Sequence, residues 1–193
     1  MRRKTGDEPF HLSGCPVDSR LLDFWSWASS DLLSNSLRGL LAEYIVATAL
    51  QLTQGVRVEW DAVDLKTNDH IRIEVKSAAY LQSWSQKSLS KIVFSIRPAN
   101  GWNAAENAYS TTATRASDIY VFCLLAHEDK TTVDPLDLAQ WRFFVVRTEI
   151  INTCCGKQKS IALSSLTQLP HIECRYQDLG KTLNSLGAPR CSQ

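Results

Sequence analysis

The heptapeptide "IRIEVKS" (residues 71–77) places a glutamate and a lysine two positions apart within a run of isoleucine and valine. In a β-strand, side chains at positions i and i+2 point to the same face of the sheet. Glu74 and Lys76 are therefore expected to stand side by side, with Ile73 and Val75 on the opposite face. Such a pattern is typical of the solvated face of an edge strand, but it can also be one half of an active site. The neighbouring elements decide between these two interpretations.

The composition is that of an ordinary soluble globular protein. The chain has 193 residues, of which 44% are hydrophobic and 21% are charged, and this suits one domain or one domain with an appended element. Its net charge of +1 gives no global basic field, although acids elsewhere can offset a local basic groove. No apolar run reaches the ~18 residues of a membrane span, and the start of the chain lacks the apolar region of a secretory signal. We expect a cytoplasmic protein with no membrane partner.

The cysteines are scattered along the chain without a C-x-x-C pair. A zinc site is conceivable, but the spacing of its ligands is irregular for paired zinc ligands; they would be Cys154, Cys155, His171 and Cys174. Free thiols in a reducing cytoplasm are the simpler interpretation.

Two helices are expected in the first part of the chain. Residues 1–17 carry glycine, proline and charge without periodicity and predict a loose arm, whereas residues 19–30 predict a short helix packed on the domain. Apolar residues recur with a helical period over residues 31–52, which predicts the longest helix. Ser30 or Asp31 can cap its start.

Extended segments follow this helix. Residues 56–65 alternate between apolar and polar, and residues 66–70 have turn composition, so the chain is expected to return through residues 71–78 as a β-hairpin. An almost continuous apolar run over residues 117–127 predicts a strand buried on both faces. Further expectations are strands at 90–96, 140–147 and 159–165, a long loop at 97–116, a short helix capped by Thr148, and a final helix at 176–186. This order predicts an α/β domain with a central mixed sheet.

An aspartate close in sequence to the heptapeptide at residues 71–77 favours the interpretation as an active site. Asp64 lies ten residues before Glu74, near the end of the preceding hairpin strand, so pairing across the turn can bring both carboxylates to one face. Two carboxylates and the backbone carbonyl of Val75 suit Mg²⁺, a hard ion that keeps several waters. Lys76 beside such an ion can orient a water or help to deprotonate it. These are the parts that in-line hydrolysis of a phosphodiester requires.

Glu43 is a candidate fourth member of this site. It lies on the helix expected at residues 31–52, between Gly39 and Ala47, in a stripe of small residues that would let the helix approach the sheet closely. A carboxylate in such a stripe is costly unless it meets a metal ion, water or a cation. The alternative is a pair with Arg38 or a nearby lysine on a solvated shoulder of the helix.

Three segments in order, "RGLLAEYIVATAL", "VDL" and "IEVKS", resemble the PD-(D/E)XK or restriction-endonuclease-like nucleases over roughly residues 31–146. The resemblance implies a restriction-endonuclease-like α-β-β-β-α-β core, in which helices flank a central mixed β-sheet. It also implies four roles: the helix acid at Glu43, metal ligands at Asp64 and Glu74, and the catalytic lysine at Lys76.

Two positions depart from the family pattern or compete with it. Val63 precedes Asp64 at the position where the motif has its proline, as happens in many members of the superfamily. Asp61 is a competing ligand three residues earlier, but the odd spacing places it on the opposite face of the strand.

The resemblance implies an endonuclease that hydrolyses DNA phosphodiester bonds with Mg²⁺, or with Mn²⁺ as a substitute. Its partner is then DNA, and a homodimer is expected from the family's habit of cutting both strands. Residues 1–30 would be an arm with a short helix, and residues 31–193 a single nuclease-like domain with a C-terminal extension. No nucleotide cofactor is expected, because the chain has neither a P-loop nor a dinucleotide fingerprint.

Two alternatives stay open. One is a catalytically silent restriction-like domain that acts as a nucleic-acid-binding or assembly module, since a fold does not guarantee activity. The other is an unrelated α/β protein in which "EVK" is the solvated face of an edge strand.

The connection after Lys76 is expected to line the substrate groove. Its polar and aromatic side chains suit sugar, base or phosphate contacts, and basic residues beyond it add local positive charge. The expected nucleic-acid contacts are Ser77, Tyr80, Gln82, Trp84, Lys87, Arg97 and Arg115. The alternative is an ordinary polar connection with a core tryptophan. Asp118 is expected mainly to begin a strand.

Overall fold

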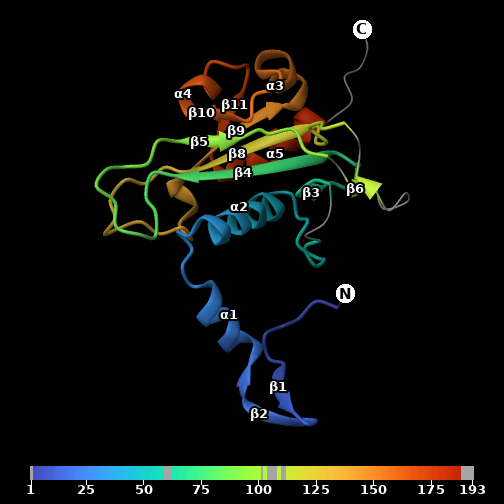
Figure 1. Cartoon of the computed structure of the whole chain (residues 1–193), viewed down its shortest axis with the longest axis vertical. Helices are drawn as coiled ribbons and strands as arrows, with labels where there is room; N and C mark the ends of the chain where they lie inside the picture. Colours follow the sequence, from blue (N-terminus) through green and yellow to red (C-terminus); the bar gives the residue numbers. More distant parts are fainter. Residues whose placement is uncertain (1, 59–61, 101, 104–107, 110–111, 188–193) are drawn as a thin grey trace.

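The centre of the fold is a five-stranded sheet with the order β11-β9-β8-β4-β3 (Figure 1). Its strands are β3 (Leu65–Lys66), β4 (Arg72–Ala79), β8 (Ile119–Leu125), β9 (Trp141–Arg147) and β11 (Ile172–Cys174). β4 and β8 are parallel, and the other neighbouring pairs of this sheet are antiparallel. The predicted α/β class with a central mixed sheet is confirmed. The structure is a computed structural model that describes residues 2–58, 62–100, 102–103, 108–109 and 112–187.

β8 lies in the middle of the sheet because it is apolar throughout, and all seven of its residues are buried. One face of the sheet is covered by α2 (Asn35–Ala49) and α5 (Tyr176–Gly187). The other face is covered by α3 (Thr148–Cys155), α4 (Leu163–Leu166) and a small sheet of β5 (Val93–Ser95) and β10 (Ser160–Ala162). Figure 1 shows α2 on one side of the sheet and α3 and α4 on the other.

The alternation along β4 divides its side chains between these two faces. Ile73 and Val75 belong to the core beneath α2 and α5, whereas Ala78 belongs to the core beneath α3. Glu74 and Lys76 alternate along β4 with Ile73 and Val75. They therefore project toward the opposite face of the sheet, the one covered by α3.

α2 is shorter than the predicted helix of residues 31–52. Its cap is Ser34, whose Oγ accepts a hydrogen bond from the backbone N–H of Leu37. The prediction of a cap at Ser30 or Asp31 is therefore wrong by about one turn. Several residues of this helix are buried against the sheet, namely Arg38, Ala42, Ile45, Val46 and Ala47.

β3 and β4 form the predicted hairpin, but β3 contains only two residues. Residues 56–58 are not in a strand, which corrects the predicted strand at 56–65. The ladder stops because the carboxylate of Asp64, rather than a backbone carbonyl, accepts the N–H of Val75, at 2.7 Å. The side chain of Asp64 thus takes the place of a neighbouring strand beside Val75 of β4.

Several other elements differ from expectation. The strand predicted at 90–96 becomes β5, which pairs with β10 outside the main sheet. The loop predicted at 97–116 contains the antiparallel pair β6 (Trp102–Asn103) and β7 (Ala108–Tyr109). Thr148 is not a cap: it is the first residue of α3, and its hydroxyl lies 3.2 Å from that of Ser117.

Residues 2–30, termed the arm, extend away from the sheet and its helices (Figure 1). The arm contains the antiparallel strands β1 (Pro9–Leu12) and β2 (Cys15–Arg20) and the helix α1 (Leu21–Ser29). No residue of α1 is buried, and Trp27 is 85% exposed, so the expectation that this helix packs on the domain is wrong. Its apolar residues spread around the helix instead of forming one stripe. Over the described part of the chain, no helix is long and apolar enough to span a membrane.

Candidate active site

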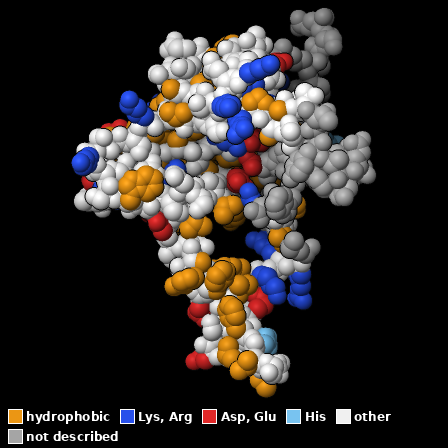
Figure 2. All heavy atoms as spheres, viewed as in Figure 1, with side chains coloured by type: hydrophobic (Ala, Val, Ile, Leu, Met, Phe, Trp, Pro, Cys, Tyr) orange, Lys and Arg blue, Asp and Glu red, His pale blue; other side chains and the backbone are white. Residues whose placement is uncertain are grey.

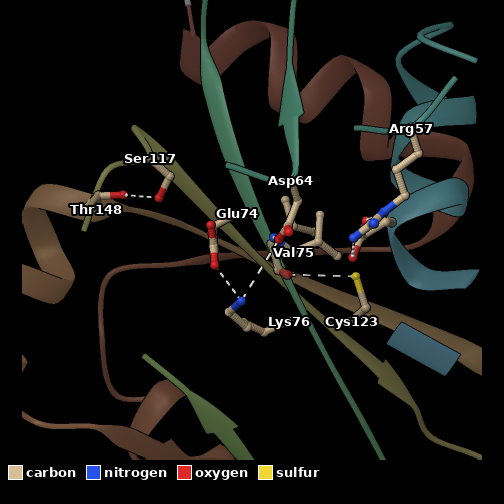
Figure 3. Close-up of polar contacts among 10 residues, drawn as sticks. Arg57, Asp64, Glu74, Val75, Lys76, Ser117, Cys123 and Thr148 are labelled. Carbon is tan, nitrogen blue, oxygen red and sulfur yellow. Dashed lines mark hydrogen bonds and ion pairs between the residues drawn. The ribbon is translucent and has the colours of Figure 1, made fainter. Parts of the chain in front are cut away.

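Asp64, Glu74 and Lys76, termed the acid–lysine cluster, meet at the edge of β4 just before β3 begins (Figure 3). The Nζ atom of Lys76 lies 2.5 Å from Oε1 of Glu74 and 4.0 Å from Oδ2 of Asp64. The hydrogen bond from the N–H of Val75 holds the Asp64 carboxylate in this position. The two carboxylates therefore share one ammonium group and do not point to opposite faces of the sheet.

The acid–lysine cluster is partly withdrawn from solvent. The side chains of Asp64, Glu74 and Lys76 are 20%, 22% and 28% exposed. Burial raises the pKa of Glu74; the charge of Lys76 opposes this, the charges of Asp64 and Glu43 add to it, and the net shift of the pKa is upward. Negative charge thus exceeds positive charge at a site of low solvation, which favours the binding of a further cation.

Tyr120 on β8 adjoins this cluster, because it is the partner of Glu74 in the parallel ladder. It is 3% exposed. Burial, and next the charge of Glu74, raises the pKa of Tyr120 to about 12. Its phenol therefore stays protonated at neutral pH and can donate a hydrogen bond. The sequence analysis missed Tyr120, since only the register between two strands distant in sequence places it here.

The donor atoms at this edge fit a hard divalent cation. Asp64 and Glu74 supply carboxylate oxygens. The N–H and C=O groups of one strand residue point to the same side, so the carbonyl of Val75 faces the edge where its N–H meets Asp64. Mg²⁺ is typically bound through one or two carboxylates and keeps several waters. These three residues would therefore suffice to hold it.

No larger metal-binding cluster forms within the described residues, where no three histidine, cysteine, aspartate or glutamate side chains lie close enough to hold one ion. The zinc alternative is thus not assembled from Cys154, Cys155, His171 and Cys174. The competing ligand Asp61 lies outside the described residues.

Glu43 pairs with Arg57 rather than with Arg38 or a lysine. Both of its oxygens are engaged: Nε of Arg57 lies 2.5 Å from Oε2, and Nη2 lies 3.0 Å from Oε1. Glu43 nevertheless lies near the acid–lysine cluster, since its charge helps to raise the pKa of Glu74, and Arg57 lies on the α2 side of that cluster (Figure 3). A Cβ at Gly39 would meet no atom within 4 Å, so the stripe of small residues does not press against the sheet at this position, although Ala47 is buried.

Comparison with known proteins adds a second, independent observation. A family model described as bacteriophage T4 endonuclease IV matches residues 20–165, about three quarters of the chain. The chain belongs to the bacteriophage T4 endonuclease IV family. The matched segment contains the acid–lysine cluster, Glu43 and Tyr120, and membership of an endonuclease family supports a nuclease function. None of the curated proteins matches the sequence significantly.

All of the predicted nucleic-acid contacts lie in the segment matched by the endonuclease IV family, and two of them serve its packing. Gln82 is 6% exposed; its side chain accepts a hydrogen bond from Nη1 of Arg38 at 3.3 Å and donates one to the carbonyl of Ala79 at 3.0 Å. The hydroxyl of Ser77 accepts from Nε of Arg38 at 3.2 Å. Arg38 is itself 4% exposed, so this network ties α2 to β4. A side chain as buried as Gln82 cannot touch a nucleic acid, which corrects that prediction.

Arg115, another predicted contact, is also engaged inside the molecule. Its guanidinium donates hydrogen bonds around the end of α3, to the carbonyls of Ile96, Gly156 and Gln158 and to the side chain of Asn152. Lys87 and Arg97 are exposed and Tyr80 is half-buried, so their contacts with a nucleic acid stay predictions. Trp84 is 54% exposed, and the alternative of a core tryptophan does not apply to it.

Asp118 lies just before β8 and joins that strand to β4, as expected for a residue that begins a strand. Its Oδ2 accepts the backbone N–H of Arg72 at 2.9 Å, and its Oδ1 lies 2.6 Å from Nη2 of the same arginine. The hydrogen bonds from Arg72 lower the pKa of Asp118. This pair fixes the register of β4 against β8, and hence the position of Glu74 beside Tyr120.

The raised pKa of Glu74 predicts a dependence of stability on pH. In metal-free protein the folded state holds the Glu74 proton more tightly than the unfolded state, so stability is lost as the pH rises through the folded pKa. Glu74→Gln removes this titration. We expect the variant to have a larger free energy of unfolding than wild type at neutral pH, and the difference to vanish below the pKa of an unfolded glutamate. Urea denaturation in EDTA across the acidic range measures it.

The control is Glu128→Gln, which changes an exposed glutamate in a loop. A stability difference for Glu74→Gln that does not change with pH would show that the raised pKa is not the cause.

Proposed function

We propose that this protein is a divalent-metal-dependent DNA endonuclease of the PD-(D/E)XK type. Asp64, Glu74 and the carbonyl of Val75 hold Mg²⁺, for which Mn²⁺ can substitute, and Lys76 positions the attacking water. The observation that carries this proposal is the Lys76 ammonium group, which lies within 4.0 Å of both carboxylates at the open edge of β4. Membership of an endonuclease family supports the same function.

Each side chain then has a role that follows from its position. The Lys76 ammonium donates a hydrogen bond to the water oxygen and Glu74 accepts one from its hydrogen, which directs a lone pair toward phosphorus. The water oxygen bonds to phosphorus and gives one proton to Glu74, while the bond from phosphorus to one ester oxygen breaks and that oxygen takes up a proton from solvent water. Mg²⁺, when bound, supplies positive charge that neutralises the phosphate and the departing oxygen. The phenol of Tyr120 on the adjacent strand stays protonated and adds no negative charge beside Glu74.

Glu43 acts in this proposal through Arg57. The bidentate pair holds the guanidinium on the α2 side of the acid–lysine cluster, where its positive charge suits a nearby phosphate. Glu43 is therefore assigned to positioning Arg57 and not to direct metal binding, because Arg57 occupies both of its oxygens.

Closed circular DNA provides the decisive substrate, since only an endonuclease can open a circle. Purified protein is expected to nick or linearise circular DNA in Mg²⁺ or Mn²⁺ and to leave it intact in EDTA. Both single-stranded and duplex circles are needed, with a circular RNA as the comparison. Binding of DNA without cleavage in either metal would instead establish the silent binding module.

A further inference from the structure

A groove of about 1160 Å³ separates the arm from the rest of the molecule. One wall is the start of the arm, from Arg2 to Thr5, together with Trp25 of α1. The opposite wall is α2 with the segment that follows it and the end of the hairpin, from Asp64 to Lys66. Figure 2 shows this hollow between the arm and the body, with Lys and Arg side chains beside it.

The groove is held in shape by two contacts. Nη1 of Arg3 donates a hydrogen bond to the carbonyl of Thr53 at 2.7 Å, which ties the start of the arm to the segment after α2. A Cβ on Gly6 would lie 3.2 Å from the ring of Trp25, so the arm packs closely on one side of this indole. The Arg3 contact thus joins the start of the arm to the body, the Gly6 contact packs the arm on itself, and the groove is lined by α2.

Positive charge is concentrated in this groove. Its lining holds five basic side chains, from Arg2, Arg3, Lys4, Arg57 and Lys66, and only two acidic ones, from Glu43 and Asp64. The lining therefore carries a net charge of +3 in a chain whose total is +1. This is the local basic surface that the near-neutral total conceals.

Two aromatic side chains face the groove as well. Trp25 is 37% exposed and Tyr44 on α2 is 55% exposed, and they come from opposite walls. Aromatic rings beside basic residues form surfaces on which sugars and bases of a nucleic acid pack.

The groove leads to the acid–lysine cluster, since Asp64 belongs to both. We propose that it binds the sugar–phosphate backbone of the DNA strand that is cut, with basic side chains from both walls on phosphates and Trp25 and Tyr44 against sugars and bases. This inference rests on the proposed function. It assigns the substrate path to the α2 side of β4, whereas the sequence-based contacts Lys87 and Arg97 are not part of the groove lining. The segment Arg2–Thr5 also lies outside the region matched by the family model.

The test measures DNA binding without cleavage. Fluorescence anisotropy of a labelled oligonucleotide, as a single strand and as a duplex, is recorded in EDTA over a range of salt concentrations. Lys4→Gln combined with Lys66→Gln removes one charge from each wall of the groove. We expect the Kd to rise several-fold, and the slope of log K against log salt to fall by about two, since each lost phosphate contact removes about one unit.

Two matched double variants serve as comparisons. Lys157→Gln with Lys159→Gln removes two exposed lysines beside α3 and is expected to leave the Kd and the slope unchanged. Lys87→Gln with Arg97→Gln tests two basic contacts that were predicted from the sequence and lie outside the groove lining. The inference is overturned if the groove variant keeps the wild-type Kd and slope while the Lys87 and Arg97 variant loses affinity.

Failure of this inference and failure of the proposed function are separable. The groove variant leaves the acid–lysine cluster unchanged, so DNA binding in EDTA and cleavage in Mg²⁺ are separate measurements. An unchanged Kd for the groove variant would contradict the inference about the groove and would not bear on the proposed nuclease function. If that variant loses affinity but the wild-type protein cuts no DNA in any metal, the inference about the groove holds and the proposed catalytic function is wrong.

Discussion

Lys76→Ala is expected to lower the rate constant of DNA cleavage by about 10³-fold, the scale of losing one positioned acid–base or charge-stabilising group. Nζ of Lys76 is 2.5 Å from Glu74 and 4.0 Å from Asp64, so its removal leaves two carboxylates without their shared cation. The charge of Lys76 lowers the pKa of Glu74. The variant should therefore also bind a proton at Glu74 more readily, and part of its lost rate should return at higher pH.

Single-turnover cleavage of a labelled DNA at saturating enzyme measures this effect apart from binding. Lys159→Ala changes an exposed lysine outside the acid–lysine cluster; it is the control and should cleave like wild type. Thermal unfolding followed by circular dichroism reports whether the fold is intact. A folded Lys76→Ala protein that cuts DNA at the wild-type rate would exclude the acid–lysine cluster as the catalytic site.

The elements that could be predicted from the sequence are those fixed by local periodicity. The apolar run of β8 and the hairpin around residues 66–70 follow from two-residue alternation and turn composition, and α2 follows from its helical period. The shared face of Glu74 and Lys76 follows from the same alternation. The sequence order therefore sufficed to bring these residues together with Asp64.

What could not be predicted depends on contacts between distant segments. Tyr120 reaches Glu74 through the parallel register of β4 and β8, which no local pattern encodes. Arg57 lies in an irregular segment whose apolar and polar residues alternate as in a strand. Its bidentate pair with Glu43 could therefore not be predicted from the sequence. Burial of polar residues was equally invisible, since Gln82 lies in a connection whose composition indicates exposure.

The packing of the arm could not be predicted from the sequence either. Its helix was expected from local apolar content, but that content does not specify which surface the helix meets. α1 remains unburied, and the arm instead forms a wall of the basic groove. A loose segment in the sequence thus becomes part of the candidate substrate path only when the tertiary structure is known.

Asp64→Asn is the second substitution with a large expected effect, because it removes one unit of negative charge while keeping the shape of the site. The asparagine oxygen can still accept the N–H of Val75, the bond that is 2.7 Å long in the structure, so the edge of β4 should stay in place. A neutral amide is a much poorer ligand for Mg²⁺ than a carboxylate. We expect the cleavage rate to fall by about 10³-fold or more at ordinary Mg²⁺ concentrations, a loss on the scale of other charge-stabilising groups.

The control is Asp69→Asn, an exposed aspartate in the turn between β3 and β4, which should leave the cleavage rate unchanged. A second readout is independent of cleavage. The charge of Asp64 raises the pKa of Glu74, so Asp64→Asn should move that pKa downward in the metal-free protein. Carbon-13 NMR of the glutamate carboxyl groups reports it directly. An unchanged Glu74 titration, together with wild-type cleavage, would mean that the two carboxylates do not act as one site, because charges that share a single ammonium group must influence each other.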